Sequence, residues 1–144
     1  MNWDISTLEK LHAAARAVSN DLEKDEEHAA LITLQGDLGA GKTAFTKELA
    51  TILGITEHIT SPTFVLAKEY KLKDQKFEKL IHIDAYRLEK GEDLGPVGFE
   101  GLLKNSNNLV VLEWPERVEE SLPAWRKEIH IVLDGDTRTL TYEK

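Results

Sequence analysis

Eight consecutive residues carry the clearest chemical signal in the chain. Gly36-Asp37-Leu38-Gly39-Ala40-Gly41-Lys42-Thr43 fits the pattern G-x-x-x-x-G-K-[ST] without a mismatch, and this pattern is typical of loops that cradle phosphate groups. Glycines let successive backbone N–H groups turn inward around phosphate oxygens, and a helix start adds partial positive charge. The Lys42 ammonium group can lie between the outer phosphates, and the Thr43 hydroxyl can bind a bridging Mg²⁺ ion. The loop therefore predicts a nucleoside triphosphate site.

The alternative interpretation of these residues is an ordinary glycine-rich turn that happens to contain Lys-Thr. The flanking segments argue against it. Residues 29–35 are apolar and strand-like, and residues 43–53 carry apolar side chains at helical spacing before Gly54. Phosphate binding by such a loop requires this order of strand, loop and helix.

Two acidic residues are expected at strand ends. Alternation over residues 77–83 sets His82 and Asp84 on one face, and the apolar run 109–112 leads into Glu113. Ligands of open α/β sheets bind at the carboxyl ends of strands, so Asp84 could hold Mg²⁺ through water or orient an attacking water. Asp84 could equally be a helix-capping or turn residue. We expect His82 to be a packed or hydrogen-bonded histidine of the strand rather than a ligand.

Two further features adjoin the expected crevice. The segment 60–64 is rich in hydroxyl groups, and Pro62 favours an extended path. It could meet the γ-phosphate and Mg²⁺, or it could be an ordinary connector. Trp114 could stack on the nucleotide or on a partner, or it could belong to the core.

The remaining elements form a frame for this site. We predict a short strand at 3–5, a helix after a capping box at Ser6-Thr7-Leu8-Glu9, a hairpin from 64–72 and 77–83, short broken helices over 89–104, and a terminal hairpin from 128–133 and 138–142. Five residues form the apolar stripe of the first helix: Leu8, Leu11, Ala15, Val18 and Leu22. The terminal hairpin carries no obvious chemistry. The predicted class is α/β: a P-loop NTPase-like three-layer sandwich with a mixed, mainly parallel central sheet and antiparallel hairpin additions.

The composition limits the classes of protein and of binding site that the chain can form. The 144 residues, 41% of them hydrophobic, suit a single domain spanning 1–144. No cysteine is available for a disulfide or thiolate site, and the five histidines lack metal-ligand spacing. The net charge of −8 argues against a broad nucleic-acid footprint. No secretory or membrane-spanning segment is indicated, so we expect a soluble, cytoplasmic protein without membrane contact.

The combined features indicate an ATPase or kinase, and ATP is favoured because no Asn-Lys-x-Asp string is present to read guanine. Four motifs, in this order and spacing, then resemble the TsaE family, the bacterial ATPases of tRNA threonylcarbamoyladenosine synthesis. They are the phosphate loop, Ser61-Pro62-Thr63-Phe64, His82-x-Asp84-x-Tyr86-Arg87-Leu88 and Glu113-Trp114-Pro115-Glu116-Arg117. The resemblance spans nearly the whole chain.

This resemblance implies a small Mg²⁺-dependent ATPase, weakly active alone. Its expected partners are TsaD and TsaB, which transfer threonylcarbamoyl to adenosine 37 of tRNA, so this chain would meet tRNA only indirectly. The implied catalytic residues are Lys42, Asp84 and Glu113. Thr43 and Glu113 would bind Mg²⁺ and Asp84 would position water, although the roles of the two acids could be exchanged. The implied nucleotide-binding residues are those of the phosphate loop, residues 36–43, together with Ala44, Thr63 and Trp114.

Other interpretations use the same loop. One is a small-molecule kinase, and another is a nucleotide-switched scaffold that does not turn over. Beyond Lys42, we take Arg87 as the cationic candidate of the motifs nearest the site, and we therefore consider an activating arginine from another protein.

Overall fold

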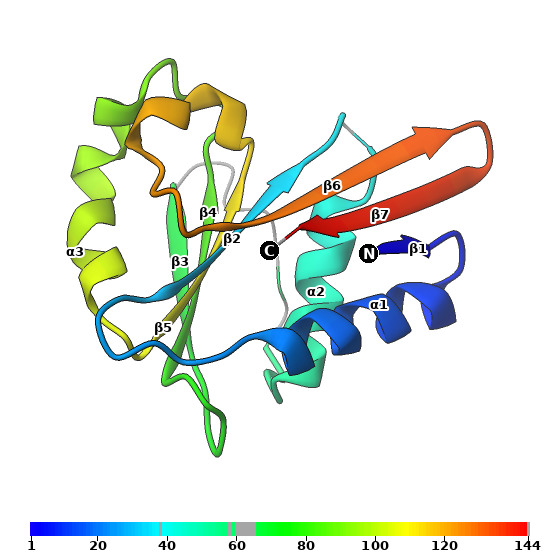
Figure 1. Cartoon of the computed structure of the whole chain (residues 1–144), viewed down its shortest axis with the longest axis horizontal. Coiled ribbons are helices and arrows are strands. Elements are labelled where there is room, and N and C mark those ends of the chain that lie inside the picture. Colours follow the sequence, from blue (N-terminus) through cyan, green and yellow to red (C-terminus); the bar gives the residue numbers. More distant parts are fainter. Residues whose placement is uncertain (38, 58, 60–65, 144) are drawn as a thin grey trace.

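The computed structural model describes residues 1–37, 39–57, 59 and 66–143. Its strands form one sheet in the order β1-β7-β6-β2-β5-β4-β3 (Figure 1). The strands are β1 (Asn2–Asp4), β2 (Ala30–Gln35), β3 (Ala67–Lys71), β4 (Lys79–Asp84), β5 (Asn108–Glu113), β6 (Lys127–Asp134) and β7 (Thr137–Glu143). The α-helices are α1 (Leu8–Asp21), α2 (Lys42–Ile52) and α3 (Phe99–Lys104), and the 3₁₀ helices are η1 (Gly91–Val97), η2 (Pro115–Arg117) and η3 (Glu119–Ser121).

The sheet is parallel at its centre and antiparallel at its edges. Strands β6, β2, β5 and β4 are parallel neighbours, whereas β3 pairs antiparallel with β4 on one side and β7 with β6 and β1 on the other. The mixed α/β class and both antiparallel hairpins are therefore confirmed. Because β2, β4 and β5 run in the same direction, their carboxyl ends meet at one edge, where Glu113 lies opposite both Leu34 and Asp84.

Helices cover both faces of this sheet. On one face, α1 and α2 bury Val18 and Phe45 against alternate residues of the central strands, and on the other, η1 and α3 bury Leu94 and Phe99 against the remaining residues. All six residues of β5 are buried, as expected for a parallel strand covered on both faces. The centre of the sheet is therefore a fixed platform for the residues at its edge.

The start of α1 differs from the prediction. Thr7, not Ser6, is the N-cap, and its hydroxyl accepts a hydrogen bond from the Lys10 N–H at 3.2 Å. The Ser6 N–H and hydroxyl both donate to Asp4 instead, at 2.8 and 2.5 Å, so the proposed capping box is wrong. Leu8 consequently begins the helix on its solvent side and is 69% exposed. The other four residues of the predicted stripe, Leu11, Ala15, Val18 and Leu22, are buried, and Ala14 joins them.

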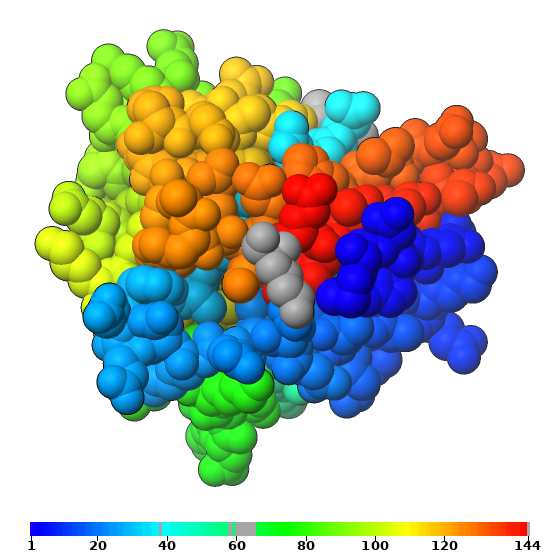
Figure 2. All heavy atoms as spheres, viewed as in Figure 1, coloured from blue at the N-terminus to red at the C-terminus, as the bar shows by residue number. Residues whose placement is uncertain are grey.

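The two ends of the described chain lie together. Figure 2 shows the N-terminal segment packed beside the C-terminal strand, and the Tyr142 N–H donates to the Met1 carbonyl at 2.9 Å. The predicted broken helices over 89–104 are confirmed as η1 and α3, whereas the prediction for the segment 60–64 falls outside the described residues. Among the helices that the structure describes, none is long and apolar enough to cross a membrane.

Gly36 sits where β2 leads into the phosphate loop, directly beside β6. A Cβ atom at this position would lie 2.6 Å from the carbonyl oxygen of Ile131, which is a backbone atom held within the β6 pairing. We predict that Gly36→Ala lowers the free energy of unfolding by about 1–3 kcal/mol, the usual effect of overpacking a tight site. Urea denaturation measures this change.

Gly101→Ala is the matched control for this experiment. Gly101 lies within α3, and an added Cβ would meet no atom within 4 Å. Alanine has the higher helix propensity, so this variant should be as stable as the wild type or slightly more stable. Equal stability of the Gly36 and Gly101 variants would contradict the close approach of β6 to the loop.

Candidate functional site

The phosphate loop joins β2 to α2 and uses two glycines for their backbone freedom. Gly39 and Gly41 have φ values of 79° and 115°, in the left-handed region that disfavours side chains. Gly41 is the N-cap of α2, and it supplies no side-chain hydrogen bond to the helix start. Because α2 begins directly after the loop, its first N–H groups and the positive end of its dipole face the loop, as an anion site requires.

Lys42 is the first residue of α2 and is only 5% exposed. Its Nζ donates to the carbonyl oxygens of Gly36 and Asp37, the latter at 3.1 Å, and lies 4.0 Å from the ring centre of Trp114. Burial lowers the pKa of Lys42 below its usual value, while nearby carboxylates, Glu113 foremost, oppose part of this shift. The cation is thus held by neutral groups that phosphate oxygens can replace.

Glu113 occupies the buried carboxyl end of β5 and is 2% exposed. Its Oε2 contacts Nε2 of His82, a fully buried residue of β4, and its Oε1 lies 3.5 Å from the Thr43 hydroxyl oxygen, a weak contact. One carboxyl oxygen is therefore fixed by His82, and the other faces the start of α2. The prediction of a packed or satisfied strand histidine at position 82 is confirmed, but its partner, Glu113, was not predicted. The available signal was a polar side chain in an otherwise apolar strand, since buried polar groups require partners.

Asp84 is a turn residue, as one of its alternative interpretations predicted. Its Oδ1 accepts a hydrogen bond from the Tyr86 N–H at 3.0 Å, which stabilises the turn after β4. The same residue lines the cavity above the phosphate loop. Asp84 is therefore both a turn residue and a member of the candidate site.

The cavity has a volume of about 520 Å³. Its lining residues come from the loop, the strand ends and β7: Gly39, Gly41, Lys42, Thr43, Ala44, Asp84, Tyr86, Arg87, Glu113, Trp114 and Arg138. Of the other predicted site residues, Gly36 and Asp37 contribute the carbonyls that hold Lys42, and Ala40 is a buried residue of the loop. Leu38 and Thr63 lie outside the described residues. Separate cavities of about 420 and 820 Å³ flank the stacked rings of His28 and Trp125 and contain no loop residue.

Trp114 lines the cavity in an uncommon backbone conformation. Its φ of 64° is rare for a residue with a side chain, and its N–H donates to the Leu34 carbonyl at 3.2 Å. The ring lies 4.9 Å from that of Tyr86. The structure therefore places Trp114 between Lys42 and Tyr86 at the cavity wall.

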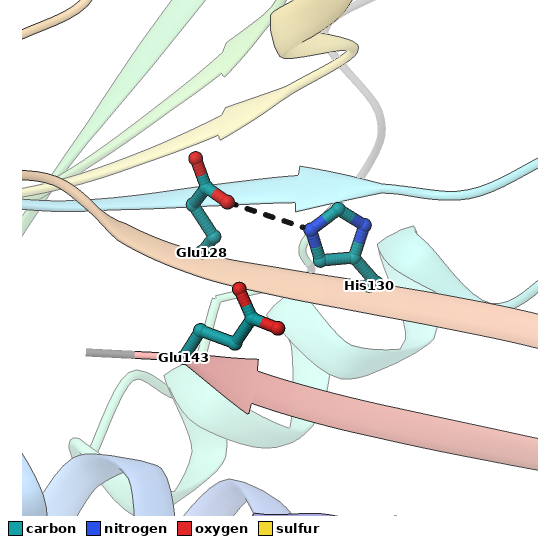
Figure 3. A group of neighbouring side chains, drawn as sticks. All are labelled: Glu128, His130 and Glu143. Atoms are coloured by element: carbon teal, nitrogen blue, oxygen red, sulfur yellow. Dashed lines mark ion pairs between the residues drawn. The ribbon is translucent and has the colours of Figure 1, made fainter.

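The terminal hairpin contributes residues that sequence reasoning did not select. Arg138 of β7 lines the cavity, and its Nη2 donates to the Gly39 carbonyl at 3.4 Å. Away from the cavity, Figure 3 shows Glu128, His130 and Glu143 gathered across β6 and β7. Glu128 pairs with His130 at 3.6 Å and with Arg126 at 3.1 Å, so two of these three side chains are joined by an ion pair.

The fold and site define an α/β protein with a phosphate-loop motif between β2 and α2 and acidic residues at two adjacent strand ends. A family model described as "Threonylcarbamoyl adenosine biosynthesis protein TsaE" matches residues 5–140. The chain belongs to the TsaE family, which confirms the resemblance found in its motifs.

Individual relatives agree with this assignment. The chain is 44% identical over 115 residues to the tRNA threonylcarbamoyladenosine biosynthesis protein TsaE of Bacillus subtilis, covering 78% of this chain and 68% of that protein. It is 40% identical over 116 residues to the protein of the same name from Treponema pallidum, covering 80% and 82%. The crystal structure of Bacillus subtilis YdiB aligns with a TM-score of 0.76 at 31% identity, over 99% of this chain and 83% of that one.

We predict that the contact between His82 and Glu113 holds the acidic side chain in place. His82→Leu leaves a buried carboxyl group without its imidazole partner, so the free energy of unfolding should fall by about 3–5 kcal/mol. The double variant His82→Leu/Glu113→Leu buries no such group and should recover part of this loss. Urea denaturation of both variants provides the measurement. A single variant at least as stable as the double one would contradict the prediction.

Proposed function

We propose that this protein binds and hydrolyses ATP with Mg²⁺ in the synthesis of threonylcarbamoyladenosine on tRNA, as a component that supports the transferase. The observation that carries the proposal is the convergence of Lys42, Thr43 and Glu113 at one cavity above the start of α2. Family membership supports the pathway, because the relatives are named for this biosynthesis. We also assign the chain to the P-loop NTPase fold, as a single domain over residues 1–144.

The residues present fit a magnesium nucleotide. The Thr43 hydroxyl and Glu113 Oε1 are 3.5 Å apart, and both are the hard oxygen ligands that Mg²⁺ prefers. The loop glycines and the helix start supply N–H groups for phosphate oxygens. When bound, Mg²⁺ would neutralise charge on the outer phosphates.

The roles of the protein side chains follow from their contacts. Lys42 exchanges the carbonyls of Gly36 and Asp37 for phosphate oxygens, and this exchange replaces neutral acceptors with charged ones. Glu113, held by His82, faces the Thr43 hydroxyl as a metal ligand. Asp84 lies opposite Glu113 on the next strand and orients the attacking water. Catalysis then rests on positioning and on charge stabilisation.

The proposed partners are TsaD and TsaB. The net charge of −8 opposes direct binding to the tRNA phosphate backbone, so contact with tRNA would run through these partners in the cytoplasm. ATP hydrolysis that depends on a complex with TsaD and TsaB would distinguish this proposal from a kinase that acts without partners.

We predict that Lys42→Ala and Glu113→Gln each reduce Mg²⁺-dependent ATP hydrolysis by about 100- to 1,000-fold, the usual effect of removing one preorganised electrostatic group. Phosphate release is measured with and without TsaB–TsaD. Lys47→Ala is the matched control, because Lys47 is an exposed lysine of the same helix and its removal should leave hydrolysis unchanged. Undiminished hydrolysis by both site variants would refute the assignment of the site.

We also predict that association with TsaB–TsaD depends on the bound nucleotide, because a complex that uses hydrolysis must distinguish ATP from ADP. Pull-down experiments in the presence of each nucleotide measure this difference. Failure to associate in either state would contradict the proposed partners. Binding of a fluorescent ATP analogue without phosphate release, even with the partners present, would instead support a nucleotide-switched scaffold.

A further inference from the structure

Arg138 is one of two arginines that line the cavity, and the proposed mechanism uses neither of them. It lies near the start of β7, opposite Leu133 of β6. Its N–H donates to the Ser6 hydroxyl at 3.0 Å, and its carbonyl oxygen accepts from the Ile5 N–H at 2.8 Å. The backbone of Arg138 is therefore held from both sides, by β6 and by the segment between β1 and α1.

The order of the sheet places Arg138 across the loop from the other cavity arginine. In the order β7-β6-β2-β5-β4, strands β7 and β4 lie on opposite sides of β2, which leads into the phosphate loop. Arg87 follows β4, and Arg138 belongs to β7. Both line the cavity, so the loop is flanked by one arginine on each side.

The present contact of the Arg138 guanidinium is a weak one. Its Nη2 lies 3.4 Å from the Gly39 carbonyl oxygen, beyond the 2.7–3.2 Å typical of good N–H···O hydrogen bonds. That carbonyl is neutral, and the cavity also contains the carboxyl groups of Asp84 and Glu113. A polyphosphate entering the cavity would add negative charge beside these two carboxyl groups, and guanidinium groups bind phosphate oxygens through two parallel hydrogen bonds.

We propose that Arg138 binds the phosphate chain of the nucleotide and so supplies an arginine to the site from within the same chain. This inference rests on the proposed nucleotide site. The guanidinium exchanges the Gly39 carbonyl for phosphate oxygens while its backbone stays fixed by Ser6 and Ile5. The terminal hairpin thereby acts as one wall of the nucleotide site as well as an extension of the sheet.

The test is the affinity of the purified chain for fluorescent N-methylanthraniloyl derivatives of ATP and ADP. Arg138→Gln should weaken binding by about 10- to 100-fold, the range for losing a hydrogen bond to a charged group. Arg138→Lys keeps the charge but not the planar fork, so its affinity should fall between those of the wild type and Arg138→Gln. Arg16→Gln, an arginine of α1 that hydrogen-bonds to His12, is the control for net charge and should bind like the wild type.

The outcomes separate this inference from the proposed function. If the wild type binds, Lys42→Ala does not, and Arg138→Gln binds like the wild type, the inference is wrong while the nucleotide site stands. If the wild type does not bind either nucleotide, both proposals fail. Melting temperatures of the Arg138 variants equal to that of the wild type would exclude a folding defect as the cause of weaker binding. A larger loss for ATP than for ADP would assign the contact to the γ-phosphate, and an equal loss would assign it to the inner phosphates.

Discussion

The burial of Glu113 is the constraint on which the site depends. An acidic side chain at the end of a fully buried strand requires a polar partner, and the parallel register of β4 beside β5 provides it in His82. This contact leaves the second carboxyl oxygen facing Thr43 at the start of α2. The same packing that satisfies a buried group therefore aims it at the phosphate loop, so the stability of the sheet and the geometry of the site are linked.

The phosphate loop imposes a second constraint, through its contact with β6. Gly36 has no room for a side chain because the Ile131 carbonyl lies against it. β6 pairs with β2 up to Gln35, the residue before the loop, and continues into the hairpin that carries Arg138. The position of the hairpin relative to the loop is thus fixed by backbone pairing and by a close approach that only glycine permits.

Local sequence patterns predicted most of the helices and strands. They could not predict contacts that depend on which strands are neighbours in the sheet. The apolar runs and glycines indicated β2, β5 and the loop, and alternation indicated both hairpins. Alternation placed His82 and Asp84 on one face but could not show that β5 is the neighbour of β4, so the partner of His82 was missed. Arg138 was missed for the same reason, because the pairing of β6 with β2 joins residues about 95 positions apart. The start of α1 was misplaced because the Ser6 N–H and hydroxyl both hydrogen-bond to Asp4, so that Ser6 does not cap the helix.

The position of Arg138 bears on whether a partner protein has to supply an arginine to the site. With Arg87 as the nearest candidate beyond Lys42, the motifs led us to consider an activating arginine from another protein, whereas the cavity contains a second arginine of the same chain. Ordering a long arginine side chain costs conformational entropy, and any surface that restricts Arg138 reduces that cost. Leu133, which lies opposite Arg138 in the hairpin, is 45% exposed, so a protein surface that covered it would bury apolar area and restrict the neighbouring guanidinium. In the proposed ATPase, a partner at this surface would favour phosphate binding by ordering an arginine that the chain already carries, without contributing a catalytic group of its own.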